Sequence, residues 1–284
     1  MVGPSLKELK ARLDELYESY NEGFLPTDPL HLVHHYGEPR DQEVVGLLSA
    51  CLAFGRADII SANASALLET MGGSPSSFFR EFRPKRDGRL FRRFRHRWLR
   101  GEDIACFIHL VKQALEEEGT IEGFFLKGYD EGEESIRPAL SSFVERLLTL
   151  DPGPFYGGPP LPRGAGVRRL LSSPSNGSPC KRLNLYLRWM VRRGDRIDLG
   201  LWPRVSPRKL IIPLDVHVAR ISWRMAEDIT RSLHRLDPDD PVKYDFAICR
   251  LGILERCKKV RRNALCRECE LRGLCLEEEV RPSP

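Results

Sequence analysis

The sequence contains no long apolar run, although 41% of its 284 residues are hydrophobic. No stretch approaches the roughly 18 consecutive apolar residues that a membrane-spanning helix requires. The N-terminal segment MVGPSLKELKARLDELYESY mixes charged and apolar residues as an amphipathic helix does, and it lacks the apolar centre of a secretion signal. We therefore expect no membrane partner and a cytoplasmic location.

The sequence also has little of the strict alternation between apolar and polar residues that is typical of strands. Apolar residues instead recur three and four positions apart in residues 5–20, 43–54 and 58–71, and a further helix is expected over 102–117. These patterns predict an all-α protein.

Positive charge exceeds negative charge, with a net charge of +5, and 35 of the 45 basic residues are arginine. Residues 80–100 contain ten of these basic residues, interleaved with Phe82, Phe91, Phe94 and Trp98. Guanidinium groups and aromatic rings together suit phosphates and stacked bases. The alternative is a solvated helix face whose aromatic residues lie in the core, and the sequence leaves both interpretations open.

Residues 150–179 are rich in proline, glycine and serine, which predicts a long loop. A helix is expected directly afterwards, with Ser178 as its N-cap, Pro179 in its first turn and an apolar stripe over 183–191. Lys181 then lies in the first turn, where the helix dipole and Arg182 disfavour its positive charge. A neutral lysine amine is able to attack carbon, so Lys181 is a candidate nucleophile.

A second candidate lies in the string KLIIPLDVHVARISWRM, where Asp215 precedes a helical apolar pattern. Asp215 is therefore expected to cap a helix. One interpretation is that Asp215 does nothing else. A carboxylate in this position is also able to stabilise the positive charge that develops on a sugar when an N-glycosidic bond breaks.

The run IPLDVHVARI resembles the signature of helix-hairpin-helix DNA glycosylases, and CKRLNLYLRWMVR places Lys181 where bifunctional members carry their lysine. The resemblance implies that Asp215 is the catalytic carboxylate and that Lys181 forms a Schiff base, which permits an abasic-site lyase step. If Lys181 is only structural, water attacks instead. It also implies contacts with DNA from four residues, namely Arg182, Arg188, His217 and Arg220.

The same strings, GSPCKRLNLYLRWMVRR and LIIPLDVHVARI, resemble still more closely a bacterial and archaeal family of unknown function. The spacing from Lys181 to Asp215 is similar to that of the archaeal 8-oxoguanine glycosylases. The expected substrate is therefore an oxidised purine, such as 8-oxoguanine, in double-stranded DNA with a damaged or mismatched base. The expected turn before the lysine helix differs from the family, because SNGSPC contains a single glycine, Gly177.

Four cysteines near the C-terminus follow the pattern C-x8-C-x2-C-x5-C, at Cys257, Cys266, Cys269 and Cys275. Four thiolates bind either a [4Fe–4S] cluster or a tetrahedral zinc ion. The last three cysteines are spaced as in the iron–sulfur loop of endonuclease III and adenine-mismatch glycosylases, although the first gap is longer here. This resemblance favours [4Fe–4S] over zinc in a structural loop over 257–275. The other cysteines, Cys51, Cys106, Cys180 and Cys249, are expected to be buried thiols.

The resemblance also predicts two helical subdomains flanking a DNA-binding cleft, one over 41–195 and one made of 1–40 plus 196–284. Lys181 and Asp215 are expected to face each other there, in a monomer associated with the nucleoid. Three aromatic residues, Phe54, Trp189 and Trp223, are either pocket walls for an extruded base or, in the favoured alternative, core residues.

Two rival functions stay open. One is a non-catalytic nucleic-acid-binding protein that keeps the glycosylase fold and the metal cluster. The other is a zinc-ribbon regulator that binds DNA through the basic C-terminal segment, which carries charge among its cysteines.

Overall fold

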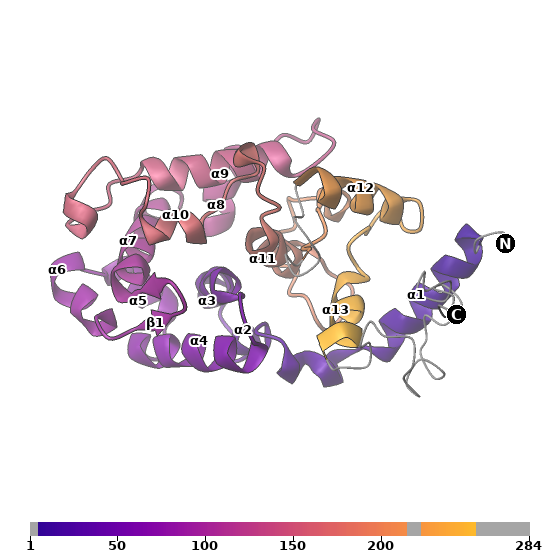
Figure 1. Cartoon of the computed structure of the whole chain (residues 1–284), viewed down its shortest axis with the longest axis horizontal. Helices are drawn as coiled ribbons and strands as arrows, with labels where there is room; N and C mark the ends of the chain where they lie inside the picture. The colour runs from indigo at the N-terminus through magenta and orange to yellow at the C-terminus, as the bar shows by residue number, and fades with distance from the viewer. Residues whose placement is uncertain (1–4, 215–222, 254–284) are drawn as a thin grey trace, which may run out of the picture.

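The computed structural model describes residues 5–214 and 223–253 of the chain. Within these ranges helices supply nearly all of the regular structure (Figure 1), and the two strands are two residues long each. The predicted all-α class is therefore confirmed.

The α-helices are α1 (Leu6–Ser19), α2 (His31–His34), α3 (Pro39–Leu52), α4 (Ala57–Met71), α5 (Pro75–Glu81), α6 (Pro84–Asp87), α7 (Gly101–Glu118), α8 (Ile121–Leu126), α9 (Arg137–Thr149), α10 (Gly166–Leu170), α11 (Lys181–Val191), α12 (Trp223–His234) and α13 (Asp245–Ile253). The 3-10 helices are η1 (Glu22–Thr27), η2 (Gly88–Phe91), η3 (Phe155–Gly157), η4 (Pro174–Asn176) and η5 (Pro207–Lys209), and the strands β1 (Arg95–His96) and β2 (Leu99–Arg100) form one antiparallel hairpin.

The helices predicted from periodicity are confirmed as α1, α3, α4 and α7. α1 begins with a capping box, in which the Glu8 amide donates to Ser5 Oγ at 3.3 Å and the Ser5 amide donates to the Glu8 carboxylate at 2.8 Å. The predicted loop over 150–179 is interrupted by η3, α10 and η4. The apolar pattern of the sequence does not predict α10, because a five-residue helix completes little more than one turn of the repeat.

Helices α3 and α11 lie side by side at the centre of the molecule (Figure 1). Gly46 of α3 faces Tyr186 and Met190 of α11, and a Cβ on Gly46 would come within 2.8 Å of Met190 Cε. The missing side chain therefore allows the two helices to approach closely. Helices α4 to α10 lie toward one end of the molecule and α1, α12 and α13 toward the other.

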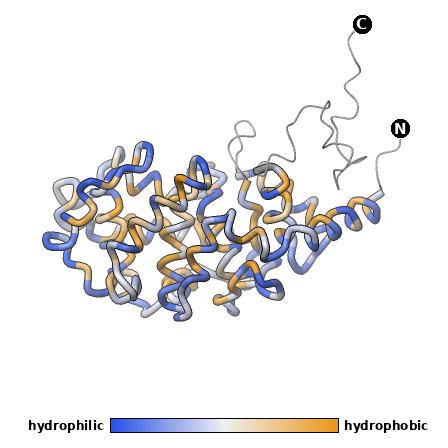
Figure 2. Tube along the Cα trace, turned by 90° about the horizontal axis from the view of Figure 1, so that it is seen from below, coloured by the Kyte–Doolittle hydropathy of each residue, from blue (hydrophilic) through white to orange (hydrophobic). Residues whose placement is uncertain are grey.

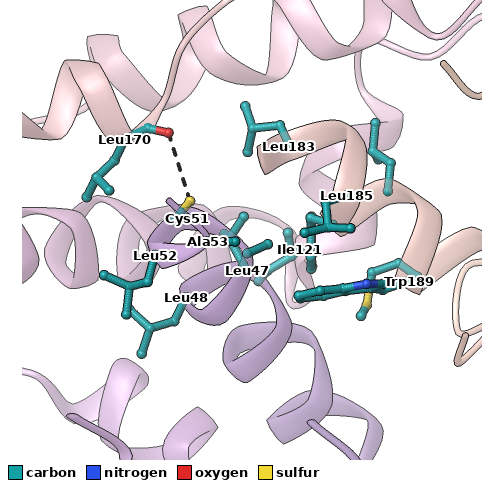
Figure 3. Close-up of a cluster of buried hydrophobic side chains, with 14 of the residues drawn as sticks. Leu47, Leu48, Cys51, Leu52, Ala53, Ile121, Leu170, Leu183, Leu185 and Trp189 are labelled. Atoms are coloured by element: carbon teal, nitrogen blue, oxygen red, sulfur yellow. Dashed lines mark hydrogen bonds between the residues drawn. The ribbon is translucent and has the colours of Figure 1, made fainter. Parts of the chain in front are cut away.

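Buried apolar residues form one contiguous cluster that extends from Leu13 to Leu251. Figure 3 shows its centre, where Leu47 and Cys51 of α3 meet Leu183 and Trp189 of α11. Hydrophobic and hydrophilic segments alternate along the trace in Figure 2, as expected for amphipathic helices around a shared core. The predicted division at residues 41 and 195 into two subdomains stays a prediction.

The arginine-rich segment 80–100 runs through α5, α6, η2 and the β1–β2 hairpin. Phe82 and Phe91 are each 1% exposed, which confirms the core interpretation for these two rings. Phe94 and Trp98 are half-buried, and nearly all of the basic side chains are exposed. Among the helices within the described ranges, none combines the length and the apolar character needed to cross a bilayer.

Candidate active site

The chain enters α11 through a tight turn. Gly177 has φ +73° and Cys180 has φ +47°, a left-handed conformation that is uncommon for residues other than glycine. The hydroxyl of Ser178 accepts the amide of Cys180 at 3.2 Å, and α11 begins at Lys181 with no side-chain cap. The predicted cap at Ser178 is therefore wrong, because its hydroxyl closes the preceding turn, whereas the position of Lys181 in the first helical turn is confirmed.

Lys181 lines a pocket of about 430 Å³, a size within the range of small-ligand sites. Its charged lining residues are Arg97, Lys181 and Arg182, and no acidic residue of the described ranges lines it. The pocket is therefore cationic. Its complete lining is Ala53, Phe54, Gly55, Arg97, Trp98, Ser172, Ser178, Pro179, Cys180, Lys181 and Arg182.

One wall of this pocket is aromatic. The rings of Phe54 and Trp98 are stacked, with centroids 5.1 Å apart and planes 11° from parallel. The guanidinium carbon of Arg182 lies 5.2 Å from the Phe54 centroid, and that of Arg169 lies 5.5 Å from the Trp98 centroid. These cation–π contacts stabilise the wall and place positive charge next to both rings.

His96 supports the wall from within. Its ring centroid lies 4.4 Å from that of Phe54, and its Nε2 lies 3.1 Å from the carbonyl oxygen of Phe54, so Nε2 is the protonated nitrogen. Nδ1 then accepts from the side-chain amide of Asn63 at 3.0 Å. Burial lowers the pKa of His96, and the ring is therefore neutral at pH 7.

Arg182 connects three segments around the pocket. Its guanidinium donates to the carbonyl oxygen of Cys51 at 3.1 Å and also to that of Arg169. Burial lowers the pKa of Arg182 from its usual very high value, and the group stays charged at neutral pH. These hydrogen bonds connect α3, α10 and α11. The contact of Arg182 with DNA stays a prediction.

Further along α11, on the side that also carries Lys181, lies a buried ion-pair network. The guanidinium of Arg188 contacts Asp198 at 3.3 Å and Asp245 at 2.5 Å, and Arg192 pairs with Asp198 and with Asp240 at 2.9 Å. Burial opposes the charge on Arg188, but the two carboxylates raise its pKa above the ordinary value. Arg188 is 1% exposed, so it faces the interior and not a phosphate, which corrects its expected contact with DNA.

The positive charge of Lys181 acts on α13. Burial raises the pKa of Asp245, and the charges of Arg188 and then of Lys181 oppose this rise. The charge of Lys181 therefore reaches the ion-pair network, and the network fixes the C-terminal part of the helix that carries Lys181.

The other predicted catalytic and DNA-contacting residues, Asp215, His217 and Arg220, lie outside the described residues. The amide of Trp223 donates to the carbonyl oxygen of Gly177 at 3.4 Å, which places the start of α12 beside the turn before Lys181.

Of the three aromatic candidates for a base pocket, two are core residues: Trp189 is 0% exposed and Trp223 is 1% exposed. Phe54 does line the pocket. The sequence gives no indication that Arg97 and Trp98 lie opposite Lys181, because more than 80 residues separate them along the chain.

The predicted cluster ligands Cys257, Cys266, Cys269 and Cys275 also lie outside the described residues. Within residues 5–214 and 223–253 no group of three or more potential ligands is arranged to hold a metal ion. Three of the remaining cysteines, Cys51, Cys106 and Cys180, are buried, as predicted, whereas Cys249 is only partly buried. Burial raises the pKa of the Cys180 thiol to about 11, so this neighbour of Lys181 is protonated at neutral pH.

These features define a helical protein with a cationic and aromatic pocket at the start of a buried central helix. The chain belongs to the family described as protein of unknown function (DUF2400), which matches residues 28–254. The matched region includes both Lys181 and Asp215 and ends before Cys257. No curated protein and no solved structure matches the chain.

Proposed function

We propose that this protein is a DNA glycosylase with an abasic-site lyase activity. The observation that carries the proposal is the position of Lys181 at the first residue of α11, on the lining of a pocket whose charged residues are all basic and whose wall is aromatic. Such a pocket suits a nucleotide, which combines an anionic phosphate with a flat base.

The damaged base has to leave the duplex before chemistry on its sugar can begin. The wall formed by Phe54 and Trp98 offers the extruded nucleotide an apolar surface, while Arg97 and Arg182 offer positive charge to its phosphate. In this proposal DNA lies across a cleft between residues 41–195 and the remainder of the chain, and an oxidised purine is the first substrate to test.

In the proposed reaction the neutral amine of Lys181 attacks C1′, and the bond from C1′ to the base breaks with its electron pair leaving on the base. Asp215 stabilises the positive charge that develops on the sugar. One proton of the attached amine then passes to the departed base. The C1′–O4′ bond breaks as O4′ takes the second amine proton, which leaves a Schiff base between Nζ and C1′. Removal of a C2′ proton then permits β-elimination of the 3′ phosphate.

The four C-terminal cysteines form a donor set that fits a [4Fe–4S] cluster, and Cys257, Cys266, Cys269 and Cys275 would hold it. The chemistry expected of the cluster is structural, in that it holds a basic loop rigid near phosphates. The proposed reaction uses no electron from it.

One observation favours the second candidate, a non-catalytic nucleic-acid-binding protein. Helix-hairpin-helix enzymes hold a phosphate on free amides of the turn, but here the amide of Gly177 donates to the carbonyl oxygen of Pro174 at 3.0 Å and that of Cys180 donates to Ser178 Oγ. Two donors of the turn are therefore already engaged within the chain.

The deciding experiment is borohydride trapping. The purified protein is incubated with duplexes that carry 8-oxoguanine, uracil, thymine glycol or an abasic site, and sodium borohydride reduces any Schiff base to a stable adduct. We expect an adduct with the wild-type protein and none with Lys181→Gln. Lys127→Gln is the matched control, because it removes one lysine charge from an exposed side chain outside the pocket.

Asp215→Asn tests the carboxylate separately. We expect base release to fall about 100-fold or more, as when a group that stabilises a transition-state charge is removed, with duplex binding retained. Unchanged base release in Asp215→Asn, or an adduct that persists in Lys181→Gln, would overturn the assigned roles. Duplex binding without any base release or adduct would instead support the non-catalytic candidate.

A further inference from the structure

The positive charge of the chain is concentrated in residues 83–100. This segment contains nine arginine or lysine residues and one acidic residue, Asp87. Because the whole chain carries +5, the residues outside this segment have a net charge of −3. The excess of positive charge is thus a local property of one surface and not a general property of the protein.

The fold turns these basic side chains outward. The hairpin pairs Arg95 with Arg100 and His96 with Leu99, and the last two residues are 2% and 0% exposed. The alternation of a two-stranded hairpin therefore buries His96 and Leu99 and leaves the arginines on the outer face. Buried aromatic residues anchor the preceding stretch in the same way.

Several arginines of this segment form no ion pair with the residues that the structure describes. Within the described part of the chain no ion pair involves the exposed residues Arg92, Arg93, Arg95, Arg97 and Arg100. We call these five residues the arginine face. Five exposed guanidinium groups within a nine-residue segment, none of them in an ion pair within the described residues, repel one another. A polyanion would relieve this repulsion.

Other exposed arginines behave differently. Arg12 contacts Glu15 at 3.0 Å, and Arg196 contacts Glu22 at 3.0 Å. These pairs lie on or beside α1, at the opposite end of the molecule from β1 (Figure 1). Their guanidinium groups are already neutralised by neighbouring carboxylates, so they make suitable controls.

The arginine face continues into the pocket. Arg97 and Trp98 belong to the hairpin and also line the pocket together with Lys181. Arg97 has φ +55°, a conformation that costs free energy in a residue other than glycine and is often retained at binding sites. Its side chain lies alongside Gly55, where a Cβ would be 3.7 Å from both Arg97 Cδ and Nη1.

We infer that the arginine face binds the sugar–phosphate backbone of DNA, with Arg97 holding the phosphate nearest the nucleotide that enters the pocket. This inference rests on the proposed function for the extruded nucleotide. The partner is a nucleic acid because guanidinium forks match phosphate oxygens, while the half-buried ring of Trp98 beside them suits a base. In this proposal the hairpin positions the DNA. The turn before α11 does not, because the amides of Gly177 and Cys180 are hydrogen-bonded within the chain.

Salt-dependent binding of an undamaged, fluorescently labelled duplex tests the surface without requiring any reaction. The double variant Arg92→Ala with Arg93→Ala removes two charges from the arginine face, and the double variant Arg12→Ala with Arg196→Ala removes two charges elsewhere. Each phosphate contact contributes about 0.9 to the slope of log K against log salt. We expect the first variant to lower the slope by about 1 to 2 and to weaken binding about tenfold, and the second to bind within about twofold of wild type. Equal losses in both variants would overturn the inference.

Trp98 provides a local readout. The chain has four tryptophans, and the other three, Trp189, Trp202 and Trp223, are at most 1% exposed. Acrylamide therefore quenches mainly Trp98, and we expect a duplex with an abasic site to protect it. Arg97→Ala should lose this protection while retaining the fold, as judged by circular dichroism. Protection that is unchanged in Arg97→Ala would overturn the role of this residue.

Competition distinguishes the partner. If polyglutamate displaces the duplex at equal charge concentration, the surface is a general polyanion or acidic-protein site and the inference is wrong. If the duplex binds through the arginine face but no base is ever released, the inference holds and the proposed glycosylase function fails.

Discussion

Arg188 shows how a single residue fixes the orientation of the helix that carries Lys181. Its guanidinium is buried between Asp198, from the loop after α11, and Asp245, the first residue of α13. A buried charge is tolerated only when it is paired and hydrogen-bonded. The pairs therefore connect α11 to the loop that follows it and to α13, on the side of the helix that also carries Lys181.

Arg188→Ala is expected to destabilise the protein by about 3 to 5 kcal/mol, because Asp245 then stays buried without its cation. Urea unfolding followed by tryptophan fluorescence measures the change. Arg196→Ala is the control, since Arg196 is 83% exposed in its side chain and its surface pair should contribute at most about 1 kcal/mol. A loss below about 1 kcal/mol in Arg188→Ala would show that the network does not stabilise the fold.

At the scale of elements, helix α1 is attached to the rest of the protein by polar contacts near α13. Asp14 of α1 accepts hydrogen bonds from Tyr244 at 2.7 Å and from Lys10 at 2.8 Å, and it pairs with Lys243 at 3.2 Å. Partial burial alone would raise the pKa of Asp14, but these three partners outweigh it and lower the pKa from 3.8 to about 2.

The attachment of α1 should therefore be sensitive to acid. Because the folded pKa of Asp14 is depressed, its stabilising contribution is present above pH 3.8 and is lost as the pH falls toward 2. Asp14→Asn should lower the free energy of unfolding at pH 7, and its difference from wild type should shrink below about pH 4. Urea titrations between pH 7 and pH 2.5 measure this, with Glu15→Gln, an exposed neighbour, as the control. A difference that is constant across this range would contradict the assigned pKa.

For the whole molecule, the cysteine pattern predicts that the protein carries iron and sulfide. Protein purified without oxygen should contain both in equal amounts and absorb near 400 nm, as expected for a [4Fe–4S] cluster. Cys266→Ala should lose most of the iron, whereas Cys106→Ala, which removes a buried thiol outside the pattern, should retain it. Zinc in place of iron would support the zinc alternative. Protein without any metal would show that the prediction of a cluster is wrong.

The sequence by itself determined the helical class and the position of Lys181 in the first turn of a helix. Both depend on local information, because the 3.6-residue period of apolar side chains is a property of consecutive residues. The sequence did not predict which residue begins the helix. Ser178 has the chemistry of a cap, but backbone geometry decided that its hydroxyl closes the turn before Cys180.

Only the tertiary structure decided what surrounds Lys181 and which arginines are free to bind a partner. Phe54, Trp98 and Lys181 are far apart in the chain, and their proximity follows from the packing of α3, the hairpin and α11. Arg188 and Arg92 look alike in a sequence, yet one is buried between carboxylates and the other is exposed and forms no ion pair within the described ranges. The physical reason is that burial and ion pairing depend on contacts between distant segments, which no local pattern of residues encodes.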